Sequence, residues 1–177
     1  QLSCQRALVY RRILELRQEK IGKLDGFERQ AAQQELSNWQ ESWIRYLVTT
    51  KQFAEAATEL AALSPETRQA QYSSLVLLEM QIAAQLGTLD AKLAAYRAEP
   101  QSAPPADLLR TAARELYAAG DKQSARKVLE FVFAREIEGH KLVAANFLGL
   151  AEIRLAAGDN AGALDLLRRL AIAVGAP

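Results

Sequence analysis

Several residue types that define whole classes of protein are scarce in this sequence. Its 177 residues include one cysteine, nine glycines and five prolines. One cysteine excludes an internal disulfide framework, and nine glycines are too few for a collagen-like chain. The most apolar uncharged stretch, 142–151, ends at Lys141 and Glu152. Because a membrane-spanning helix needs about 18 consecutive apolar residues, we expect no membrane span.

An excess of charge of one sign is missing as well. The chain has 22 Lys and Arg against 21 Asp and Glu, which gives a net charge of +1. The pairs Arg11–Arg12 and Arg168–Arg169 are isolated and too few to follow the phosphates of a duplex. A chain with almost no net charge creates no long-range electrostatic field that would attract nucleic acid or an acidic lipid surface. We therefore expect no nucleic-acid partner.

Residues that build catalytic or metal sites are equally scarce. The only histidine, His140, lies 136 positions from the only cysteine, Cys4. A catalytic thiol needs a base and a metal site needs clustered ligands, and neither arrangement is indicated. No glycine-rich phosphate-binding motif occurs, and no spacing pairs two carboxylates as acid and base. The sequence therefore predicts a protein that is not an enzyme and has no cofactor or metal.

Alanine and leucine dominate what is present. The sequence contains 33 Ala and 27 Leu, about a third of all residues. Both are strong helix formers, whereas β-branched residues are few. We therefore expect an all-α protein with eight or nine helices and no sheet.

An internal repeat organises the C-terminal half. Residues 111–133 match residues 149–171 at an offset of 38 with seven identities, among them Gly120/Gly158 and Asp121/Asp159. Each glycine can end a helix in the left-handed conformation, and each aspartate can cap the next helix. The repeat predicts two antiparallel helix hairpins over residues 105–175.

The same pattern extends toward the N-terminus with less regularity. We expect a long hairpin over 1–50, with Gly22 and Gly26 beside its turn, and degenerate hairpins over 38–100, one opened by Ser64–Pro65. The Pro- and Ser-rich segment 99–105 must interrupt helix and is interpreted as a connector within one continuous domain. Trp39 and Trp43 lie one helical turn apart and are predicted to anchor the core.

These hairpins resemble the tetratricopeptide repeat family. The residues that carry the resemblance are Leu109, Ala113, Gly120–Asp121, Ala125 and Leu129, and then Phe147, Ala151, Gly158–Asp159, Ala163 and Leu167. The match is good over 108–175, partial around Phe53 and Ala56, where Lys51 stands at the turn glycine, and does not cover 1–37. The resemblance implies a right-handed superhelical array of hairpins, an α-solenoid, that binds proteins through a concave groove.

The groove-facing positions implied by the resemblance form the candidate site. They are Arg45, Arg110, Arg114, Tyr117, Leu148 and Glu152. Arg110, Arg114 and Tyr117 are spaced i, i+4, i+7 and should share one face of a helix. Arginine offers bidentate donors to carboxylates, so an acidic or carboxylate-terminated peptide is the expected partner. The alternative is that Arg114 and Glu152 merely form a surface salt bridge.

Two other functions stay open. The chain could be a sensor or regulatory segment of a larger enzyme or transcription regulator, or an enzyme built on helical hairpins. The sequence begins with Gln1 and keeps several leucines in its last helix, so we expect a fragment of a longer array, with self-association through that helix. Nothing indicates a cellular compartment.

Overall fold

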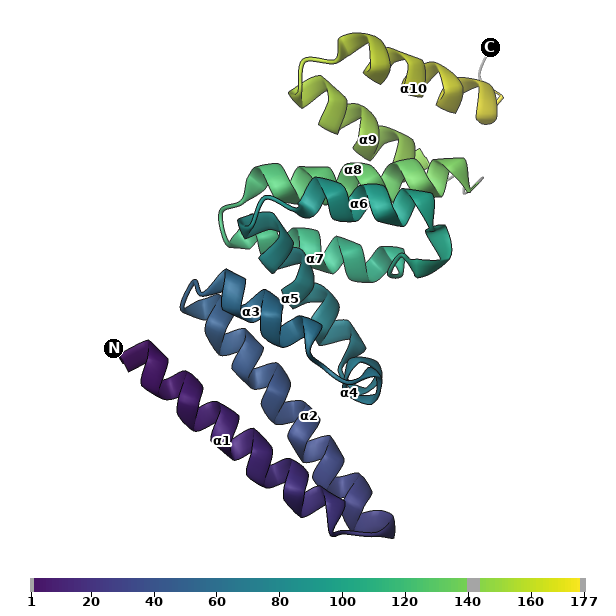
Figure 1. The fold of residues 1–177 in the computed structure, drawn as a ribbon. Coiled ribbons are helices and arrows are strands. Elements are labelled where there is room, and N and C mark those ends of the chain that lie inside the picture. Colours follow the sequence, from purple (N-terminus) through teal and green to yellow (C-terminus); the bar gives the residue numbers. More distant parts are fainter. Residues whose placement is uncertain (1, 140–143, 176–177) are drawn as a thin grey trace. The chain divides into compact units, whose positions relative to one another are not determined.

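The computed structural model describes residues 2–139 and 144–175, with side chains from residue 8 onward. His140 and the side chain of Cys4 lie outside this description. The described residues form ten α-helices, one 3-10 helix and no strand (Figure 1). The helices are α1 (Leu2–Gly22), α2 (Gly26–Thr49), α3 (Phe53–Ala61), α4 (Pro65–Ala70), α5 (Tyr72–Gln85), α6 (Leu89–Ala98), η1 (Pro100–Ser102), α7 (Ala106–Ala118), α8 (Lys122–Glu138), α9 (Ala144–Ala156) and α10 (Asn160–Ala173).

The all-α class is confirmed, but the expected count of eight or nine helices is wrong. The segment after Ser64–Pro65 forms two helices, because α4 ends at Ala70 and α5 begins at Tyr72, with only Gln71 between them. Thr67 of α4 is held against α2 by hydrogen bonds to Ser37, at 3.1 Å, and Gln40, at 3.2 Å. These tertiary bonds fix the short helix on α2, and no glycine or proline between residues 66 and 86 marks the break in the sequence.

The chain divides into two compact units, Gln1–Leu78 and Glu79–Pro177, and each is described by itself. In the first unit, α1 and α2 pack through stacked aromatic rings. The ring of Tyr10 stacks on Trp39 and Trp43, with centroid distances of 4.7 and 4.3 Å. Tyr10 is buried and both tryptophans are half-buried, so the two tryptophan rings cover Tyr10 between α1 and α2.

The turns follow the chemistry expected from the repeat. Gly120 and Gly158 have φ of +90° and +83°. Asp121 accepts a hydrogen bond from the backbone N–H of Ser124 at 3.0 Å, and Asp159 accepts one from that of Gly162 at 2.9 Å. Ser64 caps α4 in the same way, with Pro65 at the first helical position. These local interactions cap the helices where the sequence predicts that they end and begin.

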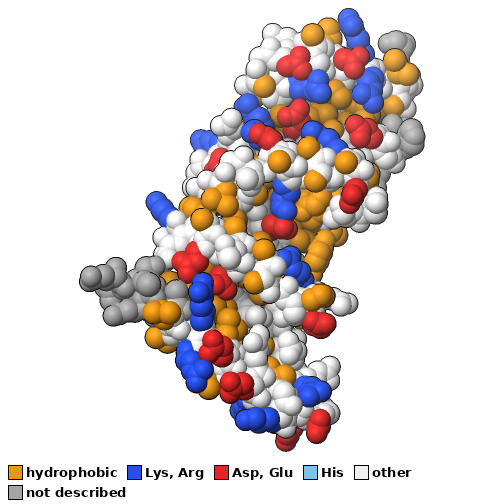
Figure 2. Space-filling view, viewed as in Figure 1, with side chains coloured by type: hydrophobic (Ala, Val, Ile, Leu, Met, Phe, Trp, Pro, Cys, Tyr) orange, Lys and Arg blue, Asp and Glu red, His pale blue; other side chains and the backbone are white. Residues whose placement is uncertain are grey.

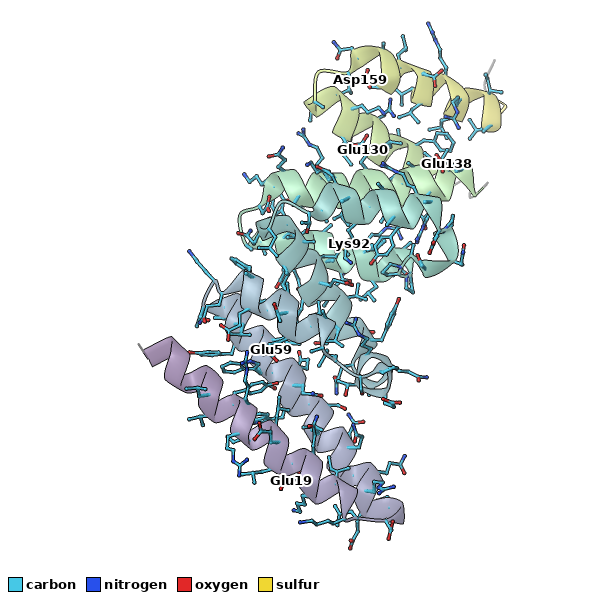
Figure 3. All side chains as sticks on the ribbon, in the orientation of Figure 1. Glu19, Glu59, Lys92, Glu130, Glu138 and Asp159 are labelled. Atoms are coloured by element: carbon cyan, nitrogen blue, oxygen red, sulfur yellow. The ribbon has the colours of Figure 1, made fainter. Side chains whose placement is uncertain are left out.

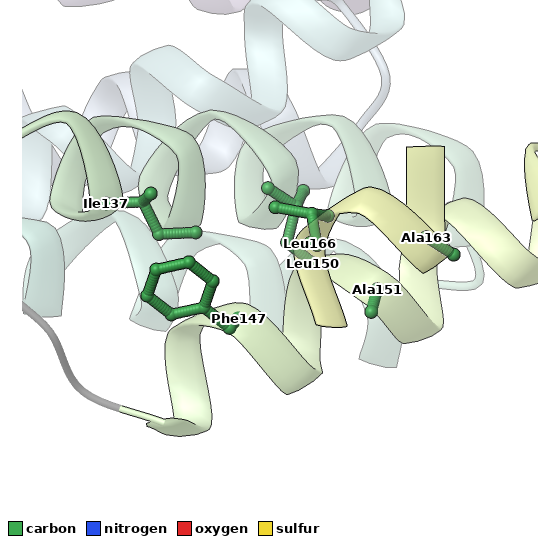
Figure 4. Close-up of a cluster of buried hydrophobic side chains, with 6 residues drawn as sticks. All are labelled: Ile137, Phe147, Leu150, Ala151, Ala163 and Leu166. Carbon is green, nitrogen blue, oxygen red and sulfur yellow. The ribbon is translucent and has the colours of Figure 1, made fainter. Parts of the chain in front are cut away.

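The second unit buries its core between consecutive helices. α7 packs on α8, α8 on α9, and α9 on α10. One cluster joins the last three of these helices through their apolar faces (Figure 4) and consists of Ile137, Phe147, Leu150, Ala151, Ala163 and Leu166. Leu164 and Ile172 of α10 are exposed, and so is Val174, which follows the helix.

The 99–105 segment interrupts helix as expected. Pro100–Ser102 forms the short η1, and α7 begins after Pro105. None of the helices within the described residues is long and apolar enough to cross a membrane.

Candidate functional site

A pocket of about 440 Å³ opens between α7, α8 and α9 of the second unit. We call it the α7–α9 pocket. Its lining consists of Ala113, Arg114 and Tyr117 from α7, Lys122, Ala125, Arg126 and Leu129 from α8, and Glu152, Ile153 and Ala156 from α9.

Three of the six predicted site residues line this pocket. Arg114 and Tyr117 are one turn apart on α7, and Glu152 comes from α9. All three side chains are exposed, Tyr117 to 59%. The repeat brings them together because α7 and α9 occupy corresponding positions in consecutive hairpins.

Small and apolar side chains form the floor of the pocket. Ala113 and Ala125 are buried, and Leu129 and Ile153 are half-buried. Both alanines belong to the repeat pattern. Larger side chains at these positions would fill the space between the helices, so the same alanines that allow close helix packing also leave the floor open.

Charges of both signs surround the floor. Arg114, Lys122 and Arg126 supply three cations and Glu152 one carboxylate. The Lys122 ammonium lies 5.6 Å from the centroid of the Tyr117 ring, which favours an attractive cation–π contact. Charges of both signs are also interspersed among hydrophobic side chains on the face in Figure 2.

The surface salt bridge between Arg114 and Glu152 is not formed. Arg114 donates to the hydroxyl of Thr111 at 3.0 Å. Within the part of the chain that the structure describes, no ion pair engages Glu152, Arg114 or Arg126. These three charged groups of the pocket are therefore not engaged in ion pairs with other side chains of the described residues.

Arg110 lies outside the pocket although it shares a helix face with Arg114. Its guanidinium pairs with Glu136 of α8 and, at 2.9 Å, with Asp107. It also lies 3.4 Å from the side-chain oxygen of Asn146 on α9. Glu136 and Asn146 are buried, so Arg110 links three helices rather than facing solvent.

The other two predicted residues are not brought to the pocket. Leu148 of α9 is 46% exposed and does not belong to its lining. Arg45 lies in the first unit, where it pairs with Glu41 at 2.6 Å and donates to Ser74 at 2.9 Å.

Lys122 and Arg126 are pocket residues that the sequence analysis did not select. Both lie on the first turns of α8, directly after the Gly120–Asp121 turn. Their repeat counterparts are Asn160 and Leu164, so the cationic character belongs to one hairpin only. A comparison of the two repeats for positions that differ in charge would have identified them.

The first unit contains a second, polar cleft of about 540 Å³ between α2 and α4. Three glutamine side chains from α2, at positions 30, 33 and 34, line it together with Arg29, Ser64 and Glu66. A hydrogen bond from its own backbone N–H and one from the Ser64 side chain lower the pKa of Glu66. No residue of the predicted site lies in this cleft.

Glu59 of α3 faces the N-terminal half of α1 (Figure 3), beside Arg11 and Tyr10. Burial raises the pKa of this carboxyl, although Arg11 opposes the shift. Burial raises the pKa of Tyr10 as well, assisted by the charge of Glu59. These charges couple α1 and α3 electrostatically within the first unit.

No three His, Cys, Asp or Glu side chains of the described residues come together as metal ligands do. Comparison with protein-family models, with curated proteins and with solved structures finds no match to this chain.

Proposed function

We propose that this protein is a binding scaffold of the tetratricopeptide repeat type, a right-handed superhelical array of helix hairpins that holds a protein or peptide partner in a groove. The observation that carries this proposal is the α7–α9 pocket, where Arg114, Tyr117 and Glu152 meet over an apolar floor. The hairpin turns at Gly120–Asp121 and Gly158–Asp159 support the resemblance.

The chemistry of the pocket suits an acidic or carboxylate-terminated peptide. Arg114 and Arg126 can donate paired hydrogen bonds to a carboxylate, and such charge-assisted bonds are among the stronger ones. Tyr117 supplies contact area with few rotatable bonds, which limits the entropy lost on binding. With three cations against one carboxylate, the field in the pocket favours an anionic segment.

The test is selection of short random peptides on the purified protein, followed by binding measurements on charge-reversed variants. We expect Arg114→Glu with Arg126→Glu to abolish binding of the selected peptides without lowering the melting temperature. The matched control is Lys23→Glu with Arg168→Glu, which reverses two exposed cations outside the pocket. Equal binding by both double variants would exclude the pocket as the binding site.

A second candidate function is a sensor or regulatory segment of a larger enzyme or transcription regulator. The pocket volume of about 440 Å³ favours it, since pockets for small molecules span roughly 300–1,000 Å³. Enrichment of small organic acids rather than peptides in a binding screen would support this candidate.

A further inference from the structure

We propose that the outer face of α10 binds the same face of a second copy of this chain, with the two helices antiparallel. α10 packs inward on α9 through Ala163, Leu166 and Leu170. Its opposite face is not covered by any described residue of the same chain. This interaction surface is separate from the α7–α9 pocket, to which α10 contributes no lining residue.

Four exposed residues form a stripe along this face, which we call the α10 stripe. They are Ala161, Asp165, Arg168 and Ile172, at successive spacings of four, three and four. This is the spacing of the contact positions of a coiled coil, so the four residues share one side of the helix. Ile172 is 78% exposed, and Leu164 beside the stripe is 48% exposed. Large aliphatic side chains on one exposed face favour burial by a partner.

The charges at the centre of the α10 stripe match in an antiparallel pair. Asp165 and Arg168 lie on either side of its midpoint, and neither forms an ion pair with another side chain of the described residues. In a two-fold symmetric contact, residue i of one copy meets residue j of the other, and j meets i. Antiparallel stripes therefore bring Asp165 of each copy to Arg168 of the other. A parallel pair would place like charges together, which is unfavourable.

The ends of the α10 stripe are complementary in size. The same antiparallel register places Ala161 of one copy opposite Ile172 of the other, so the larger side chain fills the space over the smaller one. Leu164 extends the apolar part of this contact. α10 has 14 residues and is therefore about 21 Å long. One pair of helices of this length buries less than the roughly 1,600 Å² of a standard interface, so we expect a weak dimer.

Sedimentation equilibrium of the purified chain measures this association. We expect a reversible monomer–dimer equilibrium with a dissociation constant of about 1–100 μM. Asp165→Arg should weaken the dimer by about tenfold or more, because position 165 then meets Arg168 of the second copy. Adding Arg168→Asp restores two pairs of opposite charge and should restore the wild-type dissociation constant. Circular dichroism at concentrations where the wild type is monomeric should give the same melting temperature for all variants.

A matched pair of apolar substitutions locates the surface. Ile172→Lys should weaken the dimer by about tenfold or more, because it replaces an apolar contact at each end of the stripe by a charge. Leu155→Lys, which changes an exposed leucine of α9, should leave the dissociation constant unchanged.

Three results would overturn the inference. The first is a monomer at concentrations up to about 1 mM. The second is a dimer that Leu155→Lys weakens and Ile172→Lys does not. The third is a double variant at positions 165 and 168 that does not recover the association lost in Asp165→Arg. Each of these results leaves the proposed function standing, because the α7–α9 pocket does not include α10.

Discussion

Gly149 of α9 lies directly against the ring of Phe133 of α8. A Cβ atom built at position 149 would come within 2.7 Å of Cε2 of that ring. The absence of a side chain at this position therefore sets how closely the two hairpins of the second unit approach.

From this contact we expect Gly149→Ala to have opposite effects on stability in the wild type and in a Phe133→Leu variant. Gly149→Ala should destabilise the wild type by about 1 kcal/mol, because the cost of overpacking exceeds the gain in helix propensity. With Phe133→Leu in place, the clash is removed and the same substitution should stabilise by up to about 1 kcal/mol. Chemical denaturation of the four variants measures both effects. A uniform effect in the two backgrounds would show that the contact does not limit packing.

The left-handed backbone conformation of Lys51 indicates that glycine at this position would stabilise the protein. Lys51 is the only non-glycine residue of the described chain with positive φ, at 61°, and stands where the repeat pattern has glycine. The left-handed conformation costs an L-residue roughly 1–2 kcal/mol, partly offset by the greater freedom of glycine in the unfolded chain. Lys51→Gly should therefore stabilise the protein by about 0.5–1 kcal/mol, measured by thermal or urea unfolding. Lys51→Ala, which keeps the Cβ, should bring no gain.

Removing the side chain of Arg110 should destabilise the protein more than removing that of Arg114. Arg110→Ala takes a charged donor from the buried Glu136 and a bond from Asn146, so we expect a loss of about 1–2 kcal/mol. Arg114→Ala removes an exposed side chain and should change stability by less than about 0.5 kcal/mol. Urea unfolding of the two variants measures the difference. Equal losses would contradict the separation of a structural arginine from a pocket arginine.

Glu59 predicts a pH dependence with a definite sign. Burial raises its folded-state pKa above the ordinary value of 4.5, so the folded protein holds the proton more tightly than the unfolded chain. The resulting stabilisation is fully present below the unfolded pKa and is lost as pH rises through the folded pKa. Glu59→Gln should therefore raise the melting temperature at neutral pH and have a smaller effect at acidic pH. Glu19→Gln, at an exposed position of α1, serves as the control, and an equal shift at both pH values would refute the assignment.

The helices and turns of the repeat were predictable because their causes are local. Gly120 and Asp121 act on backbone groups within a few residues, and their recurrence at Gly158 and Asp159 shows that the unit is repeated. That Trp39 and Trp43 share one face of a helix was predictable from their spacing. Their partner Tyr10 was not, since it lies 29 residues before Trp39 and no local pattern links the two.

The sequence by itself determined the helical class, the hairpin turns and the face that carries Arg110, Arg114 and Tyr117. Only the tertiary structure decided what each side chain on that face meets. Arg110 is withdrawn into an ion pair because α8 brings Glu136 to it, whereas Arg114, one turn further on, stays at the open pocket beside Glu152. The sequence pattern does not distinguish two side chains of the same type that lie on one face of a helix. The packing of neighbouring helices makes them different, because ion pairing and burial depend on distances across the chain.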